Sequence, residues 1–205
     1  KAWSTATNPA VFRQKGGPAL CARLVDVGYF YASTLLELGD ERGIPKLAER
    51  LDVDVSLLRL LRNLLYYHRF TPVSTSKLPE LRHPVRSALK AARYRSTREI
   101  LTRLGDAAER DAAAEELGVD RCELETAVSV ADLMRKPGIR YVKVRLFRAA
   151  GIRTLLELGQ VDPPAFREEL RDLIQRTGVA RAVPTPKEVA SDAAWARIYP
   201  VVATL

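Results

Sequence analysis

A short turn in the second half of the chain has the residue types that bind phosphate. Residues 136–140 read Lys-Pro-Gly-Ile-Arg and stand between two stretches with helical periodicity. A tight turn with glycine can expose successive backbone N–H groups beside the start of a helix, and these donors and the helix dipole suit a phosphate oxygen. We therefore expect Gly138 and Ile139 to supply backbone donors to an anion.

Basic side chains occur in and just after this turn. They would add a salt-sensitive attraction, and the contact would address the phosphate backbone rather than the sequence of bases. The cations of this candidate site are Lys136, Arg140, Lys143 and Arg145.

The overall charge favours a polyanionic partner. The chain of 205 residues has 33 Lys and Arg against 25 Asp and Glu, a formal net charge of +8. Such a balance suits nucleic acid, an anionic membrane surface or an acidic protein, although an Arg- and Ala-rich composition also follows from coding bias. Arg82, Arg86 and Lys90 form a second basic group, which would strengthen the nucleic-acid hypothesis if it shared a face with the turn.

The elements that would position these residues occur in related copies. The sequence TLLELG is found at 34–39 and again at 154–159, and residues 137–157 have a weaker counterpart at 79–99. Segments 48–54 and 114–120 share the pattern Ala-Glu-x-Leu-x-Val-Asp. Units this short cannot bury an apolar face alone, so they must pack on one another.

The turn at 136–140 resembles a helix-hairpin-helix motif. The ordered series at 131–135, 138–139, 150–152 and 154–158 resembles an uncharacterised family of unknown function that is built of such units. The resemblance covers about residues 82–198. It implies an all-α fold of tandem helix-hairpin-helix-like repeats packed as a compact helical array, and nucleic-acid binding as the expected activity.

The hairpins depart from the common Gly-hydrophobe-Gly pattern. Arg140 takes the second glycine position, residues 80–82 of the middle copy contain no glycine, and the first copy has Pro18, which lacks a donor. Two interpretations therefore stay open. The turns bind phosphate, or they only pack the helices together.

Composition along the chain predicts five segments. Residues 72–81 are rich in Pro and Ser and have little periodicity, which indicates a boundary. The segments are an extended arm at 1–14, a degenerate first helical repeat at 15–71, a linker at 72–81, the repeat domain at 82–198 and a C-terminal tail at 199–205.

Local signals predict where helices begin and end. Asp54 is expected to cap a helix, and Asp106 and Asp120 begin sequences in capping-box form. Gly28 and Gly118 can end helices in the left-handed conformation. Trp195 is expected to anchor the last helix in the core.

No pattern indicates catalysis, a metal or a cofactor. Cys21 and Cys122 have no cysteine or histidine at ligand spacing, so we expect buried free thiols in a reducing, cytoplasmic compartment. No apolar run approaches the roughly 20 residues of a membrane-spanning helix. We expect a binding module without enzymatic activity.

Three hypotheses about function remain. The first is sequence-independent binding of nucleic-acid backbone at the Gly138 turn. The second is a structural or adaptor protein that docks a protein partner within a larger assembly, which would be favoured if the basic residues scatter or pair with Glu157, Glu168 and Glu169. The third is small-ligand binding at aromatic clusters such as residues 66–70.

Overall fold

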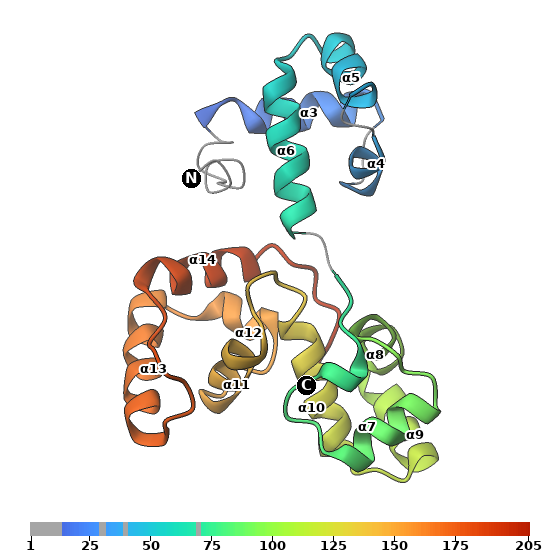
Figure 1. Cartoon of the computed structure of the whole chain (residues 1–205), viewed down its shortest axis with the longest axis vertical. Helices are drawn as coiled ribbons and strands as arrows, with labels where there is room; N and C mark the ends of the chain where they lie inside the picture. Colours follow the sequence, from blue (N-terminus) through green and yellow to red (C-terminus); the bar gives the residue numbers. More distant parts are fainter. Residues whose placement is uncertain (1–13, 29–31, 39–40, 69–70) are drawn as a thin grey trace. The chain divides into compact units, whose positions relative to one another are not determined.

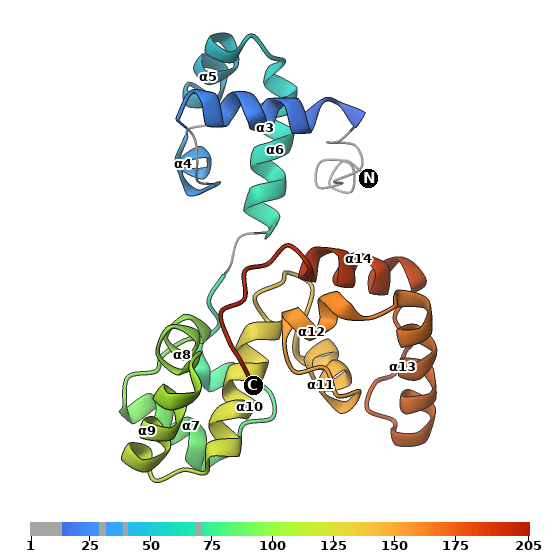
Figure 2. The same cartoon turned by 180° about the vertical axis from the view of Figure 1, so that it is seen from behind.

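The computed structural model describes residues 14–28, 32–38, 41–68 and 71–205. The chain divides into two compact units, residues 1–69 and 70–205, and each is considered by itself (Figures 1 and 2). The described residues form helices and no strand, apart from an isolated bridge between Ser74 and Ser96. The predicted all-α fold is confirmed. Except for residue 14, the expected arm at 1–14 lies outside the described residues.

The first unit has four described helices around its own apolar core. They are α3 (Gly17–Asp26), α4 (Ala32–Glu37), α5 (Gly43–Leu51) and α6 (Val55–His68). Both α4 and α5 pack on α6, whose buried Leu58 and Leu61 recur at helical spacing. Gly28 follows α3 with a φ of 91°, as the sequence predicts.

The second unit has a larger core. Its elements are the 3₁₀ turn η1 (Thr75–Lys77) and the helices α7 (His83–Ala91), α8 (Thr97–Leu104), α9 (Ala107–Leu117), α10 (Arg121–Leu133), α11 (Tyr141–Ala149), α12 (Leu155–Gln160), α13 (Pro163–Thr177) and α14 (Pro186–Ala196). In both views α10 lies between α7–α9 and α11–α14 (Figures 1 and 2). Because α10 has neighbours on both sides, residues 127–133 are all buried.

The shared Ala-Glu-x-Leu-x-Val-Asp pattern specifies a shared turn. Asp52 and Gly118 end α5 and α9 with φ values of 50° and 60°. The next N–H group then donates back to the final helical turn, from Val53 to Ala48 O and from Val119 to Ala114 O. This is the hydrogen-bonding pattern of a left-handed helix cap, and it leads directly into α6 and α10.

The hairpins before α7 and α11 also share backbone geometry. Glu80 and Gly138 occupy corresponding positions with φ values of 64° and 91°, and both helices are nine residues long. Past the helix ends, Arg93 and Gly151 again have positive φ values, 64° and 84°. The middle copy therefore builds without glycine the turns that the later copy builds with it.

The stretch expected to be a linker is packed into the second unit. Thr75 and Leu78 are buried, and backbone hydrogen bonds of 2.9 Å join Thr75 N to Arg95 O and Thr97 N to Val73 O. These bonds fasten η1 to the loop between α7 and α8. Residues 72–81 thus help to form the surface beside α7.

The segment expected to be a C-terminal tail is also packed. Ala203 is buried, and Thr204 N donates to Gly105 O. The guanidinium of Arg110, which is only 1% exposed, donates to the carbonyls of Leu104, Gly105 and Thr204. One buried arginine therefore joins α9, the α8–α9 turn and the C-terminal segment.

Some local expectations were wrong. Asp120 makes no side-chain hydrogen bond at the start of α10, whereas Asp106 accepts one from Ala108 N. Asp54 accepts a hydrogen bond from Ser56 N, as a cap would. The structure contains two reciprocal capping boxes elsewhere, formed by the pairs Thr154–Glu157 and Thr185–Glu188.

Three core predictions also need correction. Cys21 and Cys122 are exposed free thiols rather than buried ones, because they lie on outward-facing positions of α3 and α10. Trp195 is only half-buried, and α14 is anchored instead by Val189 and Ala193.

The two predicted caps offer a matched pair of variants. Asp106→Ala should lower the free energy of unfolding by about 0.5–2 kcal/mol, because it removes the acceptor for Ala108 N. Asp120→Ala should change it by about 0.5 kcal/mol or less, because no such bond is lost. Urea denaturation measures both, and equal losses would contradict the assignment of the caps.

The buried arginine should be among the most sensitive positions of the second unit. Arg110→Met keeps most of the volume but removes three hydrogen bonds to backbone carbonyls, so we expect a loss of about 2–4 kcal/mol. Arg121→Met, which removes only exposed ion pairs, should cost about 1 kcal/mol or less. Similar urea midpoints for the two variants would refute this structural role of Arg110.

Candidate nucleic-acid interface

The Gly138 turn adopts a conformation that suits glycine. Gly138 is exposed with a φ of 91°, a region that other residues rarely adopt. Ile139 is fully buried, and its N–H donates to Lys136 O at 3.2 Å. The predicted backbone donor at Ile139 is therefore already used within the turn. The first turn of α11 has no side-chain cap at Arg140, so donors for an anion would come from there.

Lys136 is a structural residue of this turn. It is 5% exposed, its Nζ lies 2.6 Å from Asp192 Oδ1, and it also donates to Pro137 O. Asp192 belongs to α14 and is itself buried. The pair therefore ties the turn to α14, and the charge of Lys136 is compensated inside the protein.

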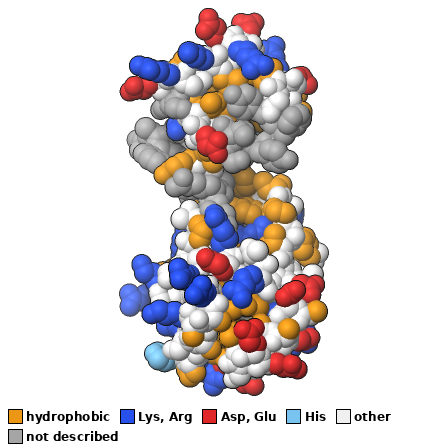
Figure 3. Space-filling view, turned by 90° about the vertical axis from the view of Figure 1, so that its right-hand side faces the viewer, with side chains coloured by type: hydrophobic (Ala, Val, Ile, Leu, Met, Phe, Trp, Pro, Cys, Tyr) orange, Lys and Arg blue, Asp and Glu red, His pale blue; other side chains and the backbone are white. Residues whose placement is uncertain are grey.

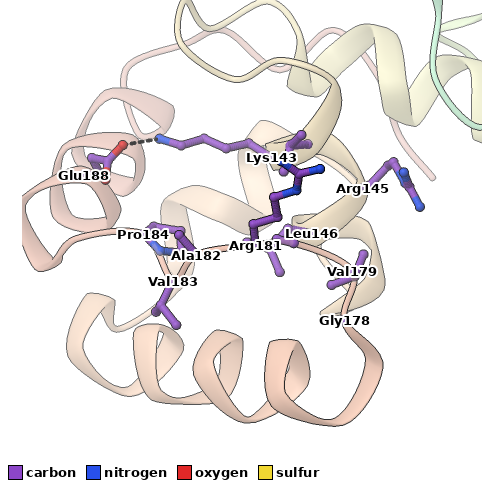
Figure 4. A pocket seen from close by; sticks show the side chains of 12 residues that line it. Lys143, Arg145, Leu146, Gly178, Val179, Arg181, Ala182, Val183, Pro184 and Glu188 are labelled. Carbon is purple, nitrogen blue, oxygen red and sulfur yellow. Dashed lines mark ion pairs between the residues drawn. The ribbon is translucent and has the colours of Figure 1, made fainter.

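Lys143 is drawn into the same network. Its Nζ lies 3.0 Å from Asp192 Oδ2 and 3.3 Å from Glu188 Oε1, the contact drawn in Figure 4. Burial alone would lower the pKa of Lys143, but the two carboxylates outweigh it and raise the pKa. The pKa of Glu188 is lowered, first by the Thr185 N–H that it accepts in the capping box and further by Lys143.

Two arginines of the predicted site remain exposed. Arg140 has only a 3.5 Å contact with Met134 O, and Arg145 forms no ion pair with a described residue. Figure 4 shows Lys143 reaching towards Glu188 while Arg145 points away from it. Arg145 and Arg181 lie at a cleft of about 570 Å³ between α11 and residues 178–184, whose other walls are mainly apolar.

The second basic group is split. Arg82 forms an ion pair with Glu123 of α10. Arg86 and Lys90 instead line a separate cleft of about 570 Å³ beside α7, together with Arg95 from the following loop. The remaining lining residues are polar or aromatic and include no carboxylate: Ser74, Thr75, Ser76, His83, Ser87 and Tyr94. We call this the α7 cleft. Figure 3 shows a face of the second unit on which Lys and Arg side chains gather.

Arg86 has no hydrogen bond to its guanidinium among the described residues. Its Nε is buried without a partner. The Nε atoms of Arg110 and Arg148 are also unpartnered, but each of those guanidinium groups binds through its other nitrogens. Buried polar groups are normally hydrogen-bonded, and the guanidinium of Arg86 is an exception among the described residues.

The charge pattern only partly follows the expectations. Basic residues of and near the turn do pair with acids, but the acids are Asp192, Glu188 and, for Arg148, Glu80. Glu157 caps α12 and Glu168 pairs within α13, so the partners named from sequence were not the ones used. Sequence reasoning also missed Arg95, whose only signal was its match to Arg153 in the repeat.

No group of histidine, cysteine and acidic residues in the described part of the chain could hold a metal ion. Its helices also include none long and apolar enough to cross a bilayer.

Comparison with known families decides the chain's membership. Residues 79–197, more than half of the chain, match a domain of unknown function, DUF4332. The chain belongs to the DUF4332 family. No curated protein and no solved structure matches it. The DUF4332 segment contains all of α7–α14. Ser74 and Ser76, which also line the α7 cleft, precede the segment.

The Lys136–Asp192 pair can be tested by substitution. Asp192→Asn leaves a buried ammonium without its carboxylate and should lower the free energy of unfolding by about 3–5 kcal/mol. The double variant Lys136→Met/Asp192→Leu should lose much less stability than the sum of the losses of Lys136→Met alone and Asp192→Leu alone. The reason is that neither the ammonium nor the carboxylate is then buried without its partner. Additive losses in urea denaturation would show that the two side chains are not coupled.

Proposed function

We propose that this chain is a non-enzymatic module that binds the phosphate backbone of nucleic acids without sequence preference. The observation that supports this best is the α7 cleft, where Arg86, Lys90 and Arg95 meet with no carboxylate in the walls. Arg95 is partly offset by Glu99, whose pKa falls through a hydrogen bond from Ser96 and, more weakly, through Arg95 itself. Neither Arg86 nor Lys90 has an ion-pair partner among the described residues.

The Gly138 turn has a smaller part in this proposal than the sequence suggested. Lys136, Lys143 and Ile139 hold the second unit together, whereas Arg140 and Arg145 are free to add to a basic surface. Contacts of this kind address phosphates and depend strongly on salt. The cytoplasm remains the compartment that we propose, and exposed free thiols are typical of a reducing compartment.

A protein-docking role is the second candidate. The cleft beside α11 is lined mainly by apolar residues, and Val142 at its edge is 58% exposed. Such a surface fits an adaptor that binds a protein partner. We rank it second because nothing in the cleft identifies the partner.

Binding assays at several salt concentrations test the proposal. Duplex and single-stranded oligonucleotides should both bind, and affinity should fall steeply with salt. Arg86→Gln, Lys90→Gln and Arg95→Gln combined should weaken binding and flatten the salt slope by about one unit per lost phosphate contact. Fluorescence anisotropy measures both quantities.

A control with the same loss of charge locates the interface. Arg140→Gln, Arg145→Gln and Arg181→Gln combined remove three cations around α11 and should have the smaller effect. A larger effect of this control would move the interface to α11. No binding to any duplex or single strand at about 50 mM salt would exclude the nucleic-acid function and favour the adaptor.

A further inference from the structure

We infer that the α7 cleft receives the terminal phosphate of a nucleic-acid strand, a phosphomonoester, rather than only the diesters along it. This inference rests on the proposed function and names the part of the ligand that the cleft selects. It follows from the donors of the cleft, their charge and the space between them.

The donors of the cleft converge from two directions. His83, Arg86, Ser87 and Lys90 recur every three or four residues, so they share one face of α7. Opposite them are η1 and Arg95, fastened together by the hydrogen bond from Thr75 N to Arg95 O. The cleft therefore has walls held by backbone hydrogen bonds and does not depend on a loose surface loop.

The unbonded guanidinium is the strongest indication of a ligand. Arg86 is half-buried, its Nε is shielded from solvent, and none of its nitrogens has a partner among the described residues. A guanidinium fork binds two oxygens of one phosphate at once. An anion with several oxygens would supply the partners that Arg86 lacks.

The charge of the cleft suits a dianion better than a diester. Three cations line it without a carboxylate. A backbone diester has one negative charge, whereas a phosphomonoester carries about −1.5 to −2 at pH 7 and has three strong acceptor oxygens. Arg95 is partly offset by Glu99, so a terminal phosphate balances the charges of Arg86 and Lys90, whereas an internal diester balances only one of them.

Hydroxyl groups at the cleft add donors for the extra oxygen. Ser74 Oγ and Ser76 Oγ lie 2.9 Å apart, so one donates to the other and the second keeps its proton for a ligand. The hydroxyl of Thr75 is already engaged with Tyr94 O. At about 570 Å³ the cleft also has room for the sugar attached to the phosphate.

The test compares strands that differ only at their ends. A short single strand with a 5′-phosphate, the same strand with a 3′-phosphate and the same strand with hydroxyl ends are titrated by fluorescence anisotropy. We expect a phosphorylated end to bind about tenfold more tightly than hydroxyl ends, the value of one good charge-assisted contact. Inorganic phosphate should remove this preference before it removes binding altogether.

Substitutions assign the preference to the cleft. Arg86→Met should make phosphorylated and hydroxyl ends bind equally, and the affinity for hydroxyl ends should itself fall by the single backbone contact that Arg86 supplies. The substitution breaks no hydrogen bond of the described structure. Arg140→Met removes the same charge outside the cleft and should preserve the preference. If Arg86→Met lowers the melting temperature, Lys90→Gln, at an exposed position, replaces it as the test variant.

The outcomes separate this inference from the proposed function. Equal binding of all three strands would overturn the terminal-phosphate site and leave backbone binding standing. A preference that survives both Arg86→Met and Lys90→Gln would overturn it too. Tighter binding of a phosphoserine peptide than of the phosphorylated strand would reassign the cleft to proteins. Failure of every strand to bind would remove the proposed function as well.

Discussion

The second unit depends on a buried carboxylate at the end of α10. Asp132 accepts hydrogen bonds of 2.7 Å from Arg135 and from Leu155 N, the first N–H of α12. Arg135 in turn donates to Pro200 O and lies over the ring of Tyr199. Asp132, Arg135 and the N–H of Leu155 are all shielded from water, so each needs the others as hydrogen-bond partners. The end of one helix, the start of another and the C-terminal segment are thereby fixed by one network.

Pairing with buried carboxylates also explains why the net positive charge of the chain does not show which basic residues can bind a ligand. A second buried carboxylate, Asp192, forms ion pairs with Lys136 in the Gly138 turn and with Lys143 in α11. Those cations are part of the framework, and they hold α11 against α14. Among the described cations without such partners, Arg86 and Lys90 lie together at the α7 cleft, whose walls contain no acid. Net charge counts both groups equally, but only the second is available to a ligand.

Sequence patterns predicted the elements better than the site. Helical spacing correctly indicated the all-α fold, and Gly118 ends a helix in the left-handed conformation as expected, because both depend on neighbouring residues. The pairing of Lys136 with Asp192 joins distant parts of the chain, and no local pattern encodes it. Asp120 shows the limit even for local signals, since a capping sequence does not ensure that its side chain turns towards the helix.

The turn between α8 and α9 has no room for a side chain at Gly105, and the C-terminal segment packs against it. Gly105 has an ordinary right-handed conformation that any residue could adopt. A methyl group there would nevertheless lie only 2.4 Å from Val202 O and 2.7 Å from Leu101 O, both of them backbone atoms. A larger residue would clash with the backbone of Val202 and displace the C-terminal segment from the helices. Arg110 would then face water instead of Thr204 O. Glycine at position 105 is therefore needed for the C-terminal segment to pack against the turn between α8 and α9.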